Sequence, residues 1–157
     1  MSEVKNCMLP TDLLYHVENN VWIRPHDDGT LDLGLTDIAQ TMAGSIIHCR
    51  PKKAGKVVKK GRSVAIVESG KWVGPVRSPF TGEIIDANTA VESDAAILNK
   101  SPYKEGWIVK LNPSNFDEDS AELVSGDEAV SKFEEYMNEK DLTECIHCEG
   151  FEGQELE

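Results

Sequence analysis

The sequence has no long apolar run, no apolar leader and few aromatic residues. No stretch approaches the roughly 20 apolar residues of a membrane-spanning helix, so a membrane span is excluded. The first ten residues, MSEVKNCMLP, have neither the basic region nor the apolar core of a secretory signal, and no organelle transit pattern is visible. We therefore expect a cytoplasmic protein. Only 6% of the residues are aromatic and 39% are hydrophobic, which suits a small β-rich domain.

Signatures of catalysis and of nucleic-acid binding are also missing. There is no Ser-His-Asp or Cys-His arrangement and no phosphate-binding loop, so we expect a protein without catalytic activity of its own. Seven basic residues lie between Arg50 and Arg62, but no aromatic residue interleaves them and no recognition helix is near. Nucleic-acid binding is therefore disfavoured, and a solvated loop with a protected strand edge is the simpler interpretation.

Basic residues are scarce at the C-terminal end. The net charge is −12, and residues 117–157 contain fifteen acidic and only two basic residues, so the rest of the chain is close to neutral. We expect three parts: a short leader over residues 1–14, a domain over residues 15–140, and an acidic tail over residues 141–157, of which only the tail is indicated by the charge distribution. The tail is polar and lacks a periodic apolar face, so we expect it to be mobile and dispensable for folding.

The four cysteines are expected to be reduced thiols, as is usual in a cytosolic protein. Cys145 and Cys148 form a lone C-x-x-C pair within the acidic tail. A structural zinc site needs four ligands, so this pair would have to recruit Cys7, Cys49 or His147. Cys145 and Cys148 are therefore only weak candidates for a metal site.

Two helices have recognisable ends. Thr36 is a good N-cap for a short helix that Gly44 would end. A longer C-terminal helix is expected from about residue 127, with Ser125 as N-cap and Glu128 completing a capping box. Phe133 and other apolar residues follow at helical spacing, which predicts that this helix packs on the body of the domain.

Lys71 occupies the most informative position in the chain. The stretch VAIVESGKWVGPVRSPFTGEI contains two alternating strands around the turn Ser69–Trp72. Gly70 followed by Lys71 fits a two-residue type II′ hairpin tip, from which Lys71 would point away from the sheet without a partner for its ammonium. Gly61 and Gly82 bracket the tip, and the flanking segments AGKVVKKG and TGEIIDAN are alike. The pattern predicts two similar half-sheets that meet at one exposed lysine.

Several ordered segments between about Tyr15 and Leu111 carry a family resemblance. They are DGTLDLGLTDIAQTMAG, VVKKGRSVAIVESGK, SPFTGEIIDAN and LNKSPYKEGWIVKL. The chain resembles the lipoyl-carrier family, and most closely the H-protein of the glycine cleavage system. The resemblance implies a mainly β fold of the lipoyl-domain type, a β-sandwich or barrelized hybrid of two antiparallel half-sheets, with short helices and a C-terminal helix. It also implies that Lys71 carries lipoate in amide linkage; the alternative is a free surface lysine.

The resemblance further implies a role and partners. An H-protein shuttles the aminomethyl group of glycine from glycine decarboxylase to aminomethyltransferase, and its arm is then reoxidised by dihydrolipoyl dehydrogenase. A lipoate ligase or a lipoyl or octanoyl transferase would attach the cofactor, reading Glu68, Gly70, Trp72 and Gly82. Glu68 could equally be a solvent-facing strand acid, and Gly61 and Gly82 are expected to be turn glycines. A biotin carrier is disfavoured, because that family has Met on both sides of its lysine.

Departures around the lysine leave the cargo open. H-proteins continue from the lysine with small residues, whereas Trp72 follows here, and they tend to be acidic where this chain is basic. In these respects the chain is similar to lipoate-binding proteins that carry sulfur for heterodisulfide-reductase-like complexes in sulfur oxidation. A third interpretation is an unlipoylated interaction or metal-binding protein organised by the acidic tail with Cys145 and Cys148.

Overall fold

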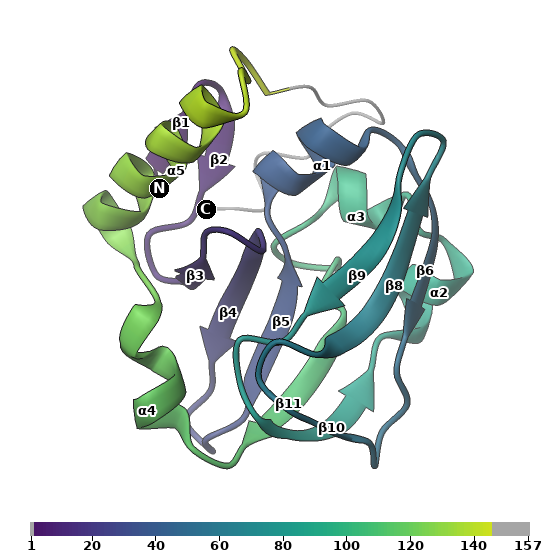
Figure 1. The fold of residues 1–157 in the computed structure, drawn as a ribbon. Coiled ribbons are helices and arrows are strands. Elements are labelled where there is room, and N and C mark those ends of the chain that lie inside the picture. Colours follow the sequence, from purple (N-terminus) through teal and green to yellow (C-terminus); the bar gives the residue numbers. More distant parts are fainter. Residues whose placement is uncertain (1, 146–157) are drawn as a thin grey trace.

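The structure is a computed structural model that describes residues 2–145, and strands form most of its regular elements (Figure 1). The larger sheet is antiparallel and has the order β3-β4-β5-β11-β10-β7. Its strands are β3 (Leu14–His16), β4 (Val21–Pro25), β5 (Leu31–Leu35), β7 (Val57–Val58), β10 (Gly82–Ala87) and β11 (Val109–Pro113). The predicted mainly β fold with short helices and a C-terminal helix is confirmed.

The smaller sheet carries the hairpin that contains Lys71. It is antiparallel with the order β6-β8-β9. Its strands are β6 (Ile46–Pro51), β8 (Ser63–Ser69) and β9 (Val73–Arg77). A separate N-terminal hairpin is formed by β1 (Ser2–Val4) and β2 (Cys7–Leu9). The long hairpin of β8 and β9 ends beside α1 (Asp37–Ala43), at the top of the view in Figure 1.

The helices are short except for the last one. They are α1, α2 (Thr89–Ser93), α3 (Ile97–Lys100), α4 (Phe116–Asp119), the 3-10 turn η1 (Ser120–Glu122) and α5 (Gly126–Glu139). Thr36 caps α1 as predicted, because its Oγ1 accepts the Ala39 N–H at 3.2 Å, and Gly44 ends the helix with a φ of 80°. The capping box of α5 is not formed: the helix begins at Gly126 and Ser125 makes no side-chain cap hydrogen bond. Among the described residues no helix is long and apolar enough to span a membrane.

The main core lies between the two sheets. Alternate residues of each strand point inward, where burial of apolar area supplies most of the stabilisation. Its fully buried members include Val21, Leu33, Val64, Val67, Ile84 and Leu111. Phe80 closes one end of this core by stacking on Phe116 at a ring-centroid distance of 5.4 Å. The core therefore holds β8, which lies between β6 and β9, against the larger sheet.

A second apolar cluster lies beneath α5. Phe133 and Met137 of this helix are fully buried, and Phe133 contacts Tyr15 edge to face at 5.5 Å. Leu9 and Leu13 belong to the same cluster. The segment that the sequence assigns to a leader thus contributes buried side chains to the body of the protein.

The cysteine prediction is wrong for two of the four residues. Cys7 of β2 and Cys145, which follows α5, are joined in a disulfide across a sequence separation of 138 residues. Both sulfurs are buried in the second cluster, and Cys145 N–H also donates to Lys5 O at 2.9 Å. Residues 141–145, which the sequence places in the acidic tail, are held against the N-terminal hairpin. Cys148 and His147 lie outside the described residues.

Cys49 is the described cysteine that remains a thiol. It is buried in β6, and burial, helped by the negative charge of Glu92, raises the pKa of the Cys49 thiol to about 12. Because only the thiolate is nucleophilic, Cys49 is unreactive at neutral pH. The prediction of a reduced thiol is confirmed at this position.

Candidate functional site

Lys71 lies at the end of the β8–β9 hairpin, as the sequence predicts. Glu68 and Val73 form the last pair of the two strands, and Ser69 N–H donates to Trp72 O at 2.7 Å. Gly70 and Lys71 are therefore the two central residues of the turn, and both are exposed. A hairpin whose strands are paired up to the last residue holds its tip in a defined position.

The turn type differs from the prediction. A type II′ turn requires a positive φ at its first central residue, but Gly70 is not in that region of conformational space. The Ser69 hydroxyl stabilises the tip instead: it accepts the Lys71 N–H at 3.3 Å and donates to Trp72 O at 3.4 Å. The sequence reasoning missed Ser69, although a serine directly before a turn is a known signal for such a hydrogen bond.

The Lys71 side chain extends from the tip over the end of α1. A Cβ atom placed on Gly44 would lie 3.4 Å from Lys71 Cε and 4.0 Å from its Nζ. Within residues 2–145 no ion pair involves Lys71. Gly44, predicted only as a helix end, thus also lies beside the lysine stem, and its positive φ is the reason for a glycine there.

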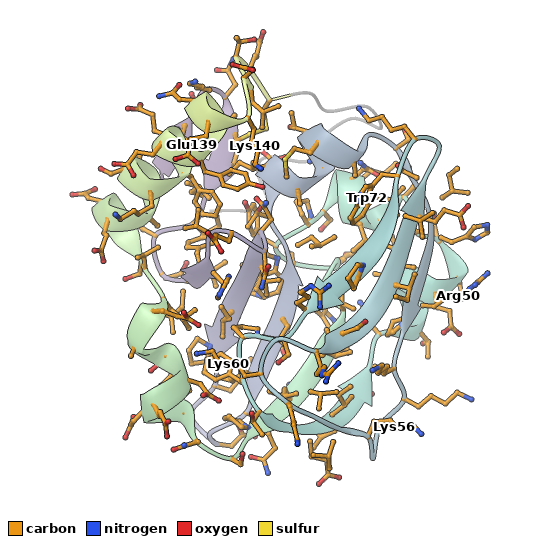
Figure 2. The ribbon with its side chains drawn as sticks, viewed as in Figure 1. Arg50, Lys56, Lys60, Trp72, Glu139 and Lys140 are labelled. Carbon is orange, nitrogen blue, oxygen red and sulfur yellow. A yellow bond between two sulfur atoms is a disulfide. The ribbon has the colours of Figure 1, made fainter. Side chains whose placement is uncertain are left out.

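Trp72 is fixed beside the lysine and remains 41% exposed. Its indole lies flat on Gly74, where a Cβ atom would come within 2.4 Å of Cζ2. Figure 2 shows Trp72 on this hairpin near its tip. Gly74 is thus a second site residue, because any larger side chain there would meet the indole.

Two cavities are lined by residues of α1, and Lys71 lines one of them. The first, of about 460 Å³, is largely apolar and is closed on one side by Trp72. Its apolar lining residues include Leu35, Ala39, Met42, Ala43, Ile46 and Leu98. The second, of about 450 Å³, is lined by Lys71 itself together with Thr41, Met42 and residues 140–144. Met42 lines both cavities, so the cavity that Lys71 lines adjoins the apolar one at this residue.

Of the other predicted recognition residues, Glu68 lies next to the tip and Gly82 lies in the other sheet. Glu68 is half-buried on the central strand of the smaller sheet, opposite His48 and Val73. Gly82 is buried in the larger sheet, paired with Pro113 and Val58. A Cβ atom there would lie 2.3 Å from Asn112 O, so close approach of β11, and not a turn, is the reason for this glycine.

Gly61 does adopt the turn conformation predicted for it, with a φ of 88°. The basic residues between Arg50 and Arg62 are all exposed, and Lys56 lies far from the hairpin tip (Figure 2). Lys60 pairs with Glu122 at 2.7 Å, and this contact raises the pKa of Lys60 and lowers that of Glu122. These residues form part of the protein surface away from Lys71.

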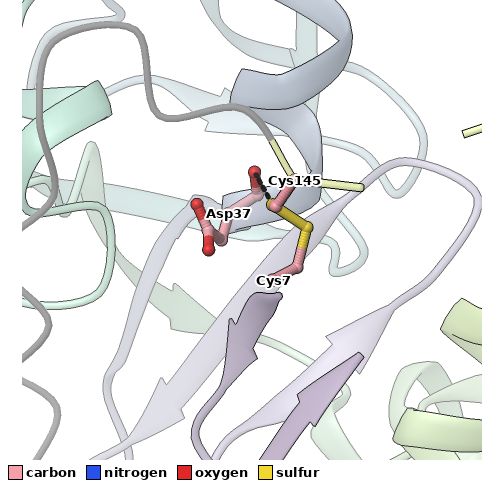
Figure 3. Close-up of side chains that lie close together, drawn as sticks. All are labelled: Cys7, Asp37 and Cys145. Atoms are coloured by element: carbon pink, nitrogen blue, oxygen red, sulfur yellow. Dashed lines mark hydrogen bonds between the residues drawn. A yellow bond between two sulfur atoms is a disulfide. The ribbon is translucent and has the colours of Figure 1, made fainter. Parts of the chain in front are cut away.

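One group of side chains has the composition of a partial metal site. The ligand atoms of Cys7, Asp37 and Cys145 all lie within 4.8 Å of one another and are buried (Figure 3). The sequence reasoning required Cys145 to recruit a distant cysteine, and the structure brings Cys7 to it. The two sulfurs are bonded to each other, however, and a metal ligand must be a thiolate. The disulfide form of this group does not supply two cysteine ligands.

Chemically, the site offers a primary amine on a rigid, exposed hairpin tip, with apolar space beside it. The α1 end and the Trp72 indole define the surroundings through which any group attached to Nζ would move. Such an arrangement suits a tethered group that must reach the active sites of other proteins.

Comparison with known proteins gives a consistent result. The sequence profile described as "Glycine cleavage H-protein" matches residues 13–136. "Glycine cleavage system H protein 2" of Aquifex aeolicus is 46% identical over 142 residues, which cover 90% of this chain and 88% of that protein. "Probable glycine cleavage system H protein 2" of Sulfurisphaera tokodaii is 46% identical over 144 residues, covering 90% and 97%. A crystal structure of a glycine cleavage system H protein from Mycobacterium marinum matches with a TM-score of 0.69 and 27% identity, over 85% of this chain and 100% of that one.

Proposed function

The chain belongs to the glycine cleavage H-protein family, and from this premise we propose that it is a lipoyl carrier whose attachment site is Lys71. The observation that carries the proposal is the exposed Lys71 at the two-residue tip of a hairpin whose strands are paired up to that tip. Its ammonium has no ion pair among the described residues, so acylation of Nζ would break no salt bridge there.

The residues around Lys71 fit a long, mostly apolar acyl group. The cavity of about 460 Å³ falls within the range of small-molecule sites, and Trp72 and Leu35 are among its walls. When attached, the lipoyl group supplies a disulfide that can accept a group and two electrons. Ser69 holds the backbone of the tip, and Gly44 ends α1 beside the lysine stem.

In this role the chain presents its cargo to other enzymes and performs no catalysis itself. We propose that it receives the aminomethyl group of glycine from glycine decarboxylase, delivers it to aminomethyltransferase, and is reoxidised by dihydrolipoyl dehydrogenase. A lipoate ligase or a lipoyl or octanoyl transferase would modify Lys71, with Glu68, Gly70 and Trp72 as the tip residues within its reach. Gly82, which is buried in the other sheet, would act only by shaping the fold.

The attachment site is tested by intact mass and peptide mapping of the protein isolated from its native host. We expect one lipoyl group per chain, located on the peptide that contains Lys71. Lys71→Arg should remove the modification completely while the fold is retained, because the side chain is exposed. Lys53→Arg, at another exposed lysine, is the matched control and should leave it in place. Recovery of only unmodified Lys71 from the host would refute the proposal and favour the unlipoylated alternative.

A second cargo is favoured by one observation, the position of Trp72. Its indole lies on Gly74 and closes the apolar cavity beside the arm, where the family usually has small residues. The alternative is that the same carrier transfers sulfur to a heterodisulfide-reductase-like complex. For the aminomethyl cargo we expect the lipoylated protein to support glycine–bicarbonate exchange with glycine decarboxylase.

The sulfur alternative makes the opposite prediction for the same preparation. It requires no glycine–bicarbonate exchange, but uptake of sulfane sulfur by the reduced arm. Trp72→Ala should then change which ligase modifies Lys71, with Val73→Ala, at a 63% exposed neighbour, as the control. Robust exchange together with an unchanged choice of ligase in Trp72→Ala would exclude the sulfur carrier.

A further inference from the structure

The Cys7–Cys145 disulfide lies behind the wall of the cavity that Lys71 enters. Thr41 and Glu144 line this cavity together with Lys71, and Glu144 directly precedes Cys145 in the chain. Thr41 Oγ1 is 2.9 Å from Cys145 Sγ. The Thr41 side chain thus stands between the buried disulfide, which Figure 3 shows beside Asp37, and the space next to the lysine.

We propose that Cys7–Cys145 is a redox-active disulfide that exchanges with a dithiol carried on Lys71. The inference rests on the proposed lipoylation of Lys71, and it assigns to the cysteine pair a role that is separate from carrying cargo. The pair would accept two electrons from the reduced arm inside the same molecule, before or instead of a visit to another enzyme.

The geometry selects which sulfur is attacked. Both cysteines are buried, but Cys145 directly follows Glu144 of the cavity wall and its Sγ lies 2.9 Å from Thr41 Oγ1 of the same wall, so an incoming thiolate reaches Cys145 Sγ first. Cys7 then leaves as the thiolate, and the Thr41 hydroxyl, 3.9 Å from Cys7 Sγ, is the polar group placed to stabilise it. In the reduced state the Asp37 carbonyl oxygen, 3.7 Å from Cys145 Sγ, can accept a hydrogen bond from the Cys145 thiol.

The exchange is balanced without an external oxidant. The Cys7–Cys145 bond breaks, and each cysteine gains one electron and one proton. The dithiol on the arm loses these two electrons and two protons as its own sulfur–sulfur bond closes. The reverse reaction restores the Cys7–Cys145 disulfide, so the pair acts as an intramolecular store of two electrons.

Tethering favours this reaction at a buried disulfide, because it raises the local concentration of the dithiol. A dithiol held on Lys71 has an effective concentration in the millimolar range near the cavity, far above that of a free dithiol at micromolar concentration. The other described cysteine, Cys49, does not compete, because its pKa of about 12 keeps it protonated.

The test is a stoichiometric reduction of the full-length lipoylated protein with dihydrolipoyl dehydrogenase and excess NADH. We expect two NADH oxidised per chain, one for the arm and one for the disulfide. After a maleimide quench, the peptides containing Cys7 and Cys145 should both be labelled. The double variant Cys7→Ser, Cys145→Ser should consume one NADH, and Lys71→Arg should consume none. Cys148→Ser is the matched cysteine control and should behave like the wild type.

Three other results of this experiment would contradict the intramolecular exchange. One NADH per lipoylated wild-type chain, with Cys7 and Cys145 unlabelled, would show a purely structural disulfide and overturn the inference. Labelling of both cysteines in Lys71→Arg would show that the enzyme reduces the disulfide directly, which would also overturn it. A rate of labelling that rises with protein concentration would replace the tethered reaction with exchange between molecules. Absence of the lipoyl group is detected beforehand by intact mass, so failure of the proposed function is distinguished from failure of this inference.

Discussion

At the scale of single residues, the glycines of the hairpin region serve different purposes. Gly82 stands where β11 approaches so closely that a Cβ atom would meet a backbone oxygen at 2.3 Å. Gly70 has no neighbouring heavy atom within 4 Å of such a Cβ position, and its φ is not positive. One glycine is therefore required by packing, and the other is not required by the fold.

This difference predicts that replacement by alanine lowers stability strongly at Gly82 and hardly at all at Gly70. Gly82→Ala should destabilise the protein by about 1–3 kcal/mol, because backbone in two paired strands must shift to make room. Gly70→Ala should change stability by less than about 0.5 kcal/mol, as expected for an exposed site without contacts. Urea denaturation of both variants measures the two free energies of unfolding. Equal effects would contradict the view that close strand approach determines Gly82.

At the scale of elements, the two helix N-termini that look alike in sequence are capped differently. The Thr36 hydroxyl accepts the Ala39 N–H at 3.2 Å and donates to Asn20 Oδ1 at 3.1 Å, and Thr36 is fully buried. Ser125 makes no side-chain cap hydrogen bond. The end of α1 matters for the site, since Gly44 at its C-terminus lies so near the stem of Lys71 that an added Cβ atom would be 3.4 Å from Cε.

We therefore expect Thr36→Ala to cost about 1 kcal/mol of stability or more, the usual loss for an N-cap that bonds the helix backbone. Ser125→Ala, the matched control at α5, should cost only a few tenths of a kcal/mol, since no cap bond is lost. The shift in thermal midpoint of each variant gives the comparison. A larger loss for Ser125→Ala would mean that the capping box forms in solution.

At the scale of the whole molecule, the disulfide ties the two ends of the described chain together. It links β2 to the residue that ends this part of the structure, and both cysteines pack with Leu9 and Phe133 in the second cluster. A bridge that closes a loop of this length restricts the unfolded chain strongly. The segment 141–145 is consequently part of the folded unit.

Reduction of the Cys7–Cys145 bond should lower the free energy of unfolding by about 2–4 kcal/mol, the typical contribution of a native disulfide. Urea denaturation with and without a strong reductant measures this difference. In Cys7→Ser the reductant should have no effect, since Cys145 has lost its partner. An unchanged midpoint of the wild type on reduction would show that the second cluster holds the two ends without the bridge.

The sequence by itself determined the features that depend on neighbours along the chain. Alternating residues and turn signals around Lys71 predict the β8–β9 hairpin and its two-residue tip, and Thr36 with Gly44 predicts the limits of α1. These features follow from hydrogen bonds and side-chain periodicity within a few residues, which any reading of the local pattern can detect. The family resemblance and the mainly β fold were accessible at this level too.

Only the tertiary structure decided what depends on residues far apart in sequence. The pairing of Cys7 with Cys145 bridges 138 residues, and the close approach of Asn112 to Gly82 comes from pairing of β10 with β11. The placement of Gly44 beneath Lys71 likewise requires α1 and the hairpin to pack together. Such contacts depend on how the whole core packs, and local periodicity or spacing in the sequence does not indicate which distant residues come together.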